Sequence, residues 1–111
     1  MIRMFLIVYT AADPNNSAQS EMGTAIKALG NWSDRLQSTW FLETNLTSGS
    51  IRDRLKQFAK NGDRIFVARM TRHWSGFGMG AGFPEWINRR QFGEYSENEA
   101  GSASSTTESS S

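Results

Sequence analysis

The side chains that could carry out chemistry are few and scattered in this sequence of 111 residues. The lack of cysteine excludes disulfides and thiolate metal sites. The one histidine, His73, cannot build a His-rich metal site alone, and it has no obvious acidic partner near it in the sequence. His73 is either a general base or, on the simpler interpretation, a partly exposed residue at the end of a strand.

A glycine-rich stretch follows this histidine. Its glycines are Gly76, Gly78, Gly80 and Gly82. A dinucleotide-binding loop needs glycines between a strand and a long helix, and a P-loop needs a following Lys-Ser/Thr pair, but the sequence has neither pattern. We therefore expect a flexible loop that is anchored by two aromatic residues, Phe77 and Phe83.

A second possible chemistry is contact with nucleic acid. Arg35 and Ser38 could bind phosphate, although they suit an ordinary strand surface equally well. Arg69, Arg72 and Trp74 combine basic and aromatic character, as in proteins that bind single strands. The predicted nucleic-acid-binding residues are Arg35, Ser38, Arg69 and Arg72.

The charge distribution is compatible with such a contact. Residues 1–90 contain all twelve basic residues and seven acidic ones, a net charge of +5, whereas the rest of the chain carries four glutamates. A basic domain with an acidic tail is compatible with nucleic-acid binding, but a surplus of this size is also ordinary for a soluble domain. Charge indicates partners here and says nothing of the fold.

The elements that must position these side chains are organised around residues 2–9, which form the longest apolar run. Apolar residues occur there at both odd and even positions, which indicates a strand buried on both faces. A buried helix is the alternative, but about eight residues are short for one. The β-branched and aromatic content also favours a strand.

A helix and a hairpin are predicted next. Asn16 is the candidate N-cap of the helix, Met22 begins a set of apolar residues at helical spacing, and Gly30 would end it in the left-handed conformation. Residues 32–45 are typical of a hairpin or a bent strand pair, with a tight turn near residues 37–38.

A second helix is the clearest local prediction. Thr47 is its candidate N-cap, and Leu46 and Ile51 would close a hydrophobic staple across its first turn. Its apolar stripe would extend to Phe58, and residues 61–62 would end it.

Residues 64–70 are predicted to form the last strand, and residues 84–90 a short helix with Pro84 at its first position. The order of elements predicts an α+β fold, a ferredoxin-like βαββαβ sandwich. Its four-stranded, mainly antiparallel sheet would carry both main helices on one face, with the first strand in a central position. Residues 70–83 could add a further strand or a crossing arm.

The chain is expected to hold one domain, residues 1–92, and a tail, residues 93–111. The tail is rich in Ser, Thr and Glu and lacks the apolar groups that would order it, so we expect it to be disordered. No apolar stretch is long enough for a membrane span and no signal peptide is recognisable, which predicts a cytoplasmic location.

The second face of the predicted sheet has no helix to cover it, although the strands carry apolar residues on both faces. An exposed apolar patch of that size usually marks an interface, so we expect a homodimer through this face. The alternative is a monomer in which Trp74, Phe77 and Phe83 fold back over their own sheet.

Several segments together resemble a known family. They are the strand that ends in Tyr9, the helix that ends in Leu29-Gly30, and residues 36–40, 51–55 and 63–67. Over roughly residues 2–75, the chain resembles the small bacterial SinR-like proteins, which are similar to the second CRISPR-associated protein family with its VapD-type toxins. (The helix-turn-helix regulator that shares the SinR name is unrelated.)

The resemblance implies a ferredoxin-like fold, a symmetric dimer and contact with nucleic acid, in a metal-dependent nuclease or a structural dimer of a DNA-integrating complex. Family members usually have an Asp directly after the strand-ending Tyr, and one from each subunit would hold a divalent metal. Here Thr10 follows Tyr9, and a hydroxyl alone is a poor Mg²⁺ ligand. We therefore expect a non-catalytic binding or scaffold protein without a cofactor; the alternative is an Mg²⁺-dependent endonuclease that uses Asp13.

Overall fold

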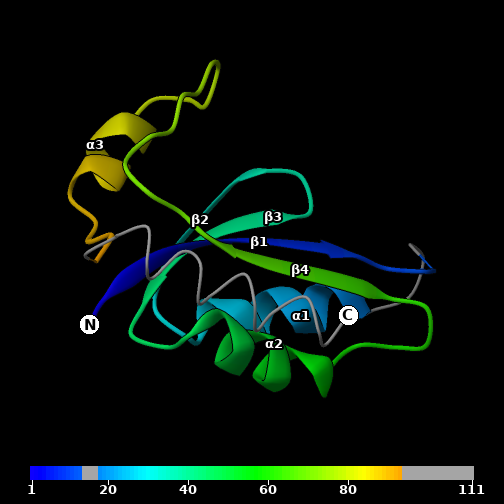
Figure 1. Cartoon of the computed structure of the whole chain (residues 1–111). Helices are drawn as coiled ribbons and strands as arrows, with labels where there is room; N and C mark the ends of the chain where they lie inside the picture. Colours follow the sequence, from blue (N-terminus) through cyan, green and yellow to red (C-terminus); the bar gives the residue numbers. More distant parts are fainter. Residues whose placement is uncertain (14–17, 94–111) are drawn as a thin grey trace.

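The computed structural model describes residues 1–13 and 18–93, which form one sheet with helices on both faces (Figure 1). The elements in chain order are β1 (Arg3–Thr10), α1 (Ala18–Lys27), β2 (Asn31–Leu36), β3 (Thr39–Thr44), α2 (Ser48–Lys56), β4 (Arg64–Arg69) and α3 (Phe83–Asn88). The sheet order is β2-β3-β1-β4, and every neighbouring pair is antiparallel. The predicted ferredoxin-like arrangement is confirmed.

The central strand β1 is buried on its helix face, and on its second face Met4 is buried while Leu6 and Val8 are half-buried. Leu6 lies opposite Phe41 of β3 on one side and Ala68 of β4 on the other. Phe5, which points to the opposite face from Leu6, is 1% exposed. Such two-sided burial explains why β1 lacks the polar alternation of a strand with one wet face.

The first face of the sheet packs on α1 and α2, which lie together beneath it in Figure 1. This core consists of Phe5, Ile7, Tyr9, Met22, Ile26, Trp40, Leu42, Ile51 and Leu55. Met22 and Ile26 are fully buried, which confirms the predicted apolar side of the first helix. The predicted N-cap of that helix, Asn16, lies outside the described residues.

The second helix begins as predicted and ends earlier. Thr47 is the N-cap, and its hydroxyl accepts a hydrogen bond of 3.1 Å from the backbone N–H of Ser50. The helix ends at Lys56 because the chain tightens there, with the Phe58 N–H donating to the carbonyl of Leu55. Phe58 is therefore 37% exposed and does not extend the buried stripe.

Two turns show where local sequence signals succeed and fail. The β2–β3 hairpin turns at residues 37–38, as predicted, with Ser38 in the left-handed region at φ 56°. Gly30 was predicted to end α1 in the left-handed conformation, but its φ is not positive. Glycine is needed there for a different reason, since a Cβ on Gly30 would lie 2.0 Å from the carbonyl oxygen of Glu43.

The second face is partly covered by the chain's own C-terminal segment, which we define as residues 70–92. Within it the structure has no strand. The predicted short helix is present as α3, which begins one residue earlier and ends two residues earlier than predicted, with Pro84 in its first turn. A second core forms beneath it, from Met4, Phe41, Phe83, Ile87 and Phe92. The premise that this face lacks a helix is thus corrected.

The segment covers only part of the second face. In Figure 1, α3 lies on the side of the sheet where β1 begins, while the loop before α3 rises away from the strands. Phe83 is buried at 2% exposure, whereas Phe77 is 98% exposed and anchors nothing.

No helix in residues 1–13 and 18–93 is long and apolar enough to span a membrane. The predicted tail lies outside the described residues, except Gly93.

Candidate functional site

The C-terminal segment is held to the sheet by a buried carboxylate, Glu43. This residue follows the alternation of β3, so it shares the second face with Phe41 and lies opposite Met4 of β1. Its side chain is 9% exposed and faces Arg90, whose side chain is 18% exposed, with 3.3 Å between Nη1 and Oε1. Burial makes this pair far more consequential than a surface ion pair.

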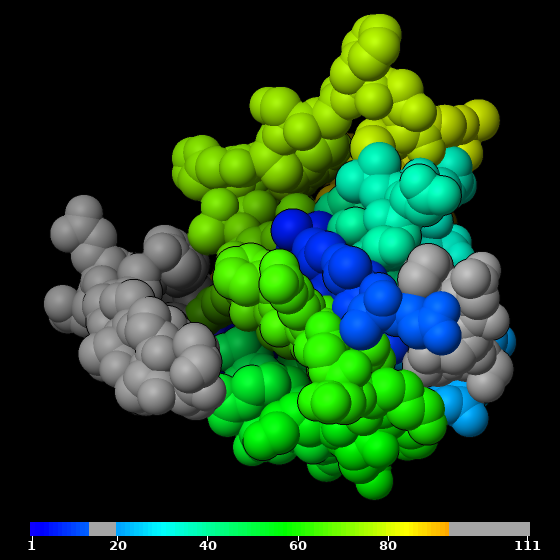
Figure 2. All heavy atoms as spheres, turned by 90° about the vertical axis from the view of Figure 1, so that its right-hand side faces the viewer, coloured from blue at the N-terminus to red at the C-terminus, as the bar shows by residue number. Residues whose placement is uncertain are grey.

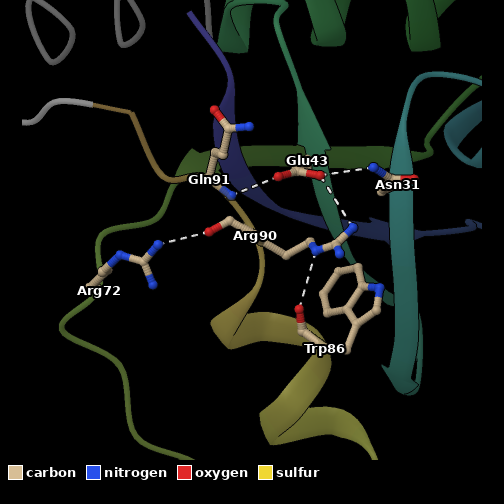
Figure 3. A network of polar contacts seen from close by, with 6 residues as sticks. All are labelled: Asn31, Glu43, Arg72, Trp86, Arg90 and Gln91. Atoms are coloured by element: carbon tan, nitrogen blue, oxygen red, sulfur yellow. Dashed lines mark hydrogen bonds and ion pairs between the residues drawn. The ribbon is translucent and has the colours of Figure 1, made fainter.

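Every oxygen of the Glu43 carboxylate has a donor (Figure 3). Oε1 also accepts a 2.8 Å hydrogen bond from Nδ2 of Asn31, and Oε2 accepts one of 2.6 Å from the backbone N–H of Gln91. Arg90 in turn donates from Nε to the Trp86 carbonyl at 3.1 Å and lies over the Trp86 ring. This network connects β2 and β3 to the residues that follow α3.

Three of the predicted nucleic-acid-binding residues hold the same segment. Arg35 donates to the carbonyls of Met79 and Ala81, each at 3.1 Å. Arg69 donates to the Phe92 carbonyl at 3.1 Å, and Arg72 donates to the Arg90 carbonyl at 2.8 Å. These guanidinium groups satisfy backbone carbonyls of an irregular segment that has few ladder partners.

The structure does not bring the four predicted residues into a single patch. Arg35 and Ser38 lie on the β2–β3 hairpin at one side of the sheet, whereas Arg69 ends β4 at the opposite edge and Arg72 follows it. Each guanidinium has five N–H donors, and the carbonyl contacts of Arg35 use two of them. A phosphate contact remains a prediction that would involve two separate groups of residues.

An apolar pocket lies between the sheet and the C-terminal segment. Its volume is about 230 Å³, and it opens to solvent. The lining residues are Leu6, Leu36, Phe41, Met70, Trp74, Ser75, Gly76, Met79, Phe83 and Ile87. With so few polar groups, it fits an apolar side chain or a small apolar molecule better than a charged substrate.

The glycine-rich loop forms the rim of this pocket. Gly78, Gly80 and Gly82 all have positive φ, at 70°, 95° and 89°. The Arg35 guanidinium donates hydrogen bonds to two backbone carbonyls of this loop, those of Met79 and Ala81. The loop therefore forms one wall of the pocket.

The end of β1 carries the residues expected from the nuclease resemblance. Thr10 and Asp13 are both exposed there. Asp63 lies close to this loop, and its carboxylate accepts from the Tyr9 hydroxyl and from the backbone N–H groups of Ala12 and Lys60 at 2.9 Å and 2.8 Å. Asp63 thus fixes the loop after β1 to the turn before β4.

Metal-ligating residues do not cluster within the described part of the chain. No group of three or more His, Cys, Asp or Glu residues there could hold an ion. His73 is exposed and lies four residues after the end of β4, and its backbone N–H donates to the hydroxyl of Thr71 at 3.2 Å.

Comparison with protein-family models, with curated proteins and with solved structures gave no match.

Two carboxylates were not identified from the sequence: Glu43, which binds the C-terminal segment, and Asp63, which binds the loop after β1. Glu43 had a usable signal, since it occupies an inward position on a strand directly after the apolar residues 40–42. A charge at such a position requires a buried partner. Asp63 had no comparable signal, because its three donors come from backbone turns and from Tyr9, 54 residues away.

Proposed function

We propose that this protein is a non-catalytic binding or scaffold protein that acts as a homodimer through the second face of its sheet. The observation that carries the proposal is the apolar surface that the C-terminal segment leaves open. Phe66, directly opposite Val8 on that face, is 62% exposed, and Leu36 at the pocket is 45% exposed.

The position of this surface favours a protein partner. Phe66 lies on β4, an edge strand, and its neighbour Val8 is only half-buried. The surface is continuous with the pocket, because Leu6 lies two residues from Val8 on the same strand face. Contiguous exposed apolar surface of this kind is typical of interfaces, and a two-fold pair is the commonest assembly.

The family resemblance supports the same proposal. The ferredoxin-like order of elements is the one that the resemblance to the SinR-like and CRISPR-associated proteins implies, and that resemblance also implies a symmetric dimer. Contact with nucleic acid is the remaining part of the proposal, through Arg35 and Ser38 on one side and Arg69 and Arg72 on the other. An affinity for RNA or DNA that does not change with salt concentration would exclude a phosphate-driven contact.

The alternative, an Mg²⁺-dependent endonuclease that uses Asp13, is tested separately. The protein and an Asp13→Ala variant are incubated with single- and double-stranded RNA and DNA in Mg²⁺ or Mn²⁺. We expect no metal-dependent cutting, because the resembled family usually has an Asp at the position that Thr10 occupies here. Cutting that disappears in the variant would establish the nuclease.

The dimer itself is tested with two matched substitutions. Phe66→Ser changes the open face, and Phe58→Ser changes a phenylalanine at the end of α2, 37% exposed, on the other side of the sheet. Sedimentation equilibrium should show a weaker dimer for Phe66→Ser and an unchanged dimer for Phe58→Ser. Equal effects of the two substitutions would contradict an interface at the open face.

A further inference from the structure

We infer that the apolar pocket receives the Phe77 side chain of a second copy of this chain, so that each copy fills the pocket of the other. This inference rests on the homodimer proposed above and names its central contact. It commits to one occupant, because the chain itself presents a side chain that matches the pocket in size and in chemistry.

The pocket has room for a phenyl ring. Its volume is about 230 Å³, and an engineered apolar cavity of about 150 Å³ is enough to bind benzene. Leu6 and Phe41 come from the sheet, and Met79 comes from the C-terminal segment. Among the described residues, Ser75 and the indole of Trp74 supply its only polar side-chain groups. A charged group would lose its hydration there with little compensation.

The Phe77 side chain projects into solvent, away from its own chain. It is 98% exposed, the highest value among the exposed large apolar residues of the described chain. It lies between Gly76 and Gly78, and a Cβ on Gly78 would meet no atom within 4 Å. Figure 2 shows the loop around it standing above the β2–β3 hairpin and β1. The ring therefore occupies no pocket within its own chain.

The pocket rim and Phe77 belong to the same stretch of chain. Ser75, Gly76 and Met79 line the pocket on either side of Phe77. A two-fold axis near this loop would therefore bring each Phe77 to the pocket of the other copy, which is the reciprocal contact of a two-fold interface. Leu36 at the pocket and Phe66 on the open face would add apolar area around the two rings.

A photo-cross-link tests the contact directly. Phe77 is replaced by 4-azidophenylalanine in isotopically heavy chains, which are mixed with light wild-type chains and irradiated. Mass spectrometry should find heavy-to-light cross-links from position 77 to Leu36, Met70 or Met79. Cross-links confined to the heavy chain would show that Phe77 enters its own pocket, and no cross-link to these residues would place it elsewhere; either result overturns the inference.

A substitution separates this inference from the homodimer proposal. Phe77→Ala should raise the dimer dissociation constant at least about tenfold, the loss expected for a buried aromatic anchor, while Phe58→Ala should leave it unchanged. If wild type is a dimer and Phe66→Ser weakens it while Phe77→Ala does not, the homodimer stands and this inference fails. If wild type is a monomer at all concentrations, both fail.

Discussion

Tyr9 donates its hydroxyl hydrogen to the carboxylate of Asp63, which joins the end of β1 to the turn before β4. Tyr9 is fully buried on the helix side of the sheet, while Asp63 is half-buried at the surface. Burial first, and then the hydrogen bond and the charge of Asp63, raise the pKa of Tyr9 to about 12 from its ordinary value of 10.0. The loop in which Asp13 lies is therefore anchored by a contact that responds to pH.

The ionisation of Tyr9 should be delayed in the folded protein. The chain has one other tyrosine, Tyr95, so a Tyr95→Phe background makes tyrosinate absorbance a measure of Tyr9 alone. We expect a midpoint near pH 12 in place of 10. Since the folded pKa is raised, the contribution of Tyr9 to stability is complete below pH 10 and is lost as the pH rises toward 12. A midpoint near 10 in protein that is still folded would contradict the contact.

The Asp63 carboxylate of the same pair should show the opposite dependence of stability on pH. The hydrogen bond from Tyr9, followed by those from the Ala12 and Lys60 amides, lowers the pKa of Asp63 below its ordinary 3.8. Its contribution to stability is therefore complete above that value and is lost as the pH falls below it. Asp63→Asn should lower the melting temperature by several degrees at pH 7 and flatten its fall in acid. Asp53→Asn, which alters an exposed pair with Arg52, should change neither.

Replacing Glu43 with Gln should loosen the C-terminal segment. The substitution keeps the shape of the side chain but removes the charge that faces Arg90 and receives the Gln91 amide. We expect a loss of about 2 kcal/mol of unfolding free energy, typical of hydrogen bonds to a charged group. Hydrogen exchange at the Gln91 amide should also accelerate.

The matched control for Glu43 is Glu21→Gln. Glu21 pairs with Lys60 at 3.9 Å, and both side chains are more than half exposed. Such a pair contributes little to stability, so the substitution should change neither the free energy of unfolding nor the rate of hydrogen exchange at the Gln91 amide. Unchanged Gln91 protection in Glu43→Gln would mean that the network does not hold the segment.

Gly30→Ala should destabilise the β2–β3 side of the sheet. The new Cβ would meet the Glu43 carbonyl oxygen at 2.0 Å, so the backbone must shift. Overpacking of this kind costs about 1–3 kcal/mol. Gly49→Ala in α2, where the nearest atom is 3.9 Å away on the Arg52 side chain, should cause no loss. Chemical denaturation of both variants measures the contrast, and equal stabilities would refute the close approach at Gly30.

Local signals predicted most of the ferredoxin-like frame. The two-sided apolar pattern of β1, the Thr47 cap and the residues 37–38 turn each depend on a few neighbouring residues, and all three are present in the structure. The conformation of Gly30 and the end of α2 depend on packing between elements, and there the local rules were wrong.

The candidate site could be predicted less well, because long-range contacts build it. Arg35 reaches the Met79 carbonyl across 44 residues of sequence, and backbone carbonyls leave no signature in a sequence. An arginine that binds phosphate and one that binds a carbonyl have the same appearance in a sequence. The sequence shows that the C-terminal segment contains aromatic residues, but only the fold shows that Phe83 is buried and Phe77 is exposed.

The mass of the protein in solution tests the central claim most directly. Light scattering across a concentration series should approach twice the 12.4 kDa mass of one chain, because the open apolar surface around Phe66 needs a second copy to cover it. A mass of one chain at every concentration, with Phe66 and Phe77 accessible to solvent, would contradict the account.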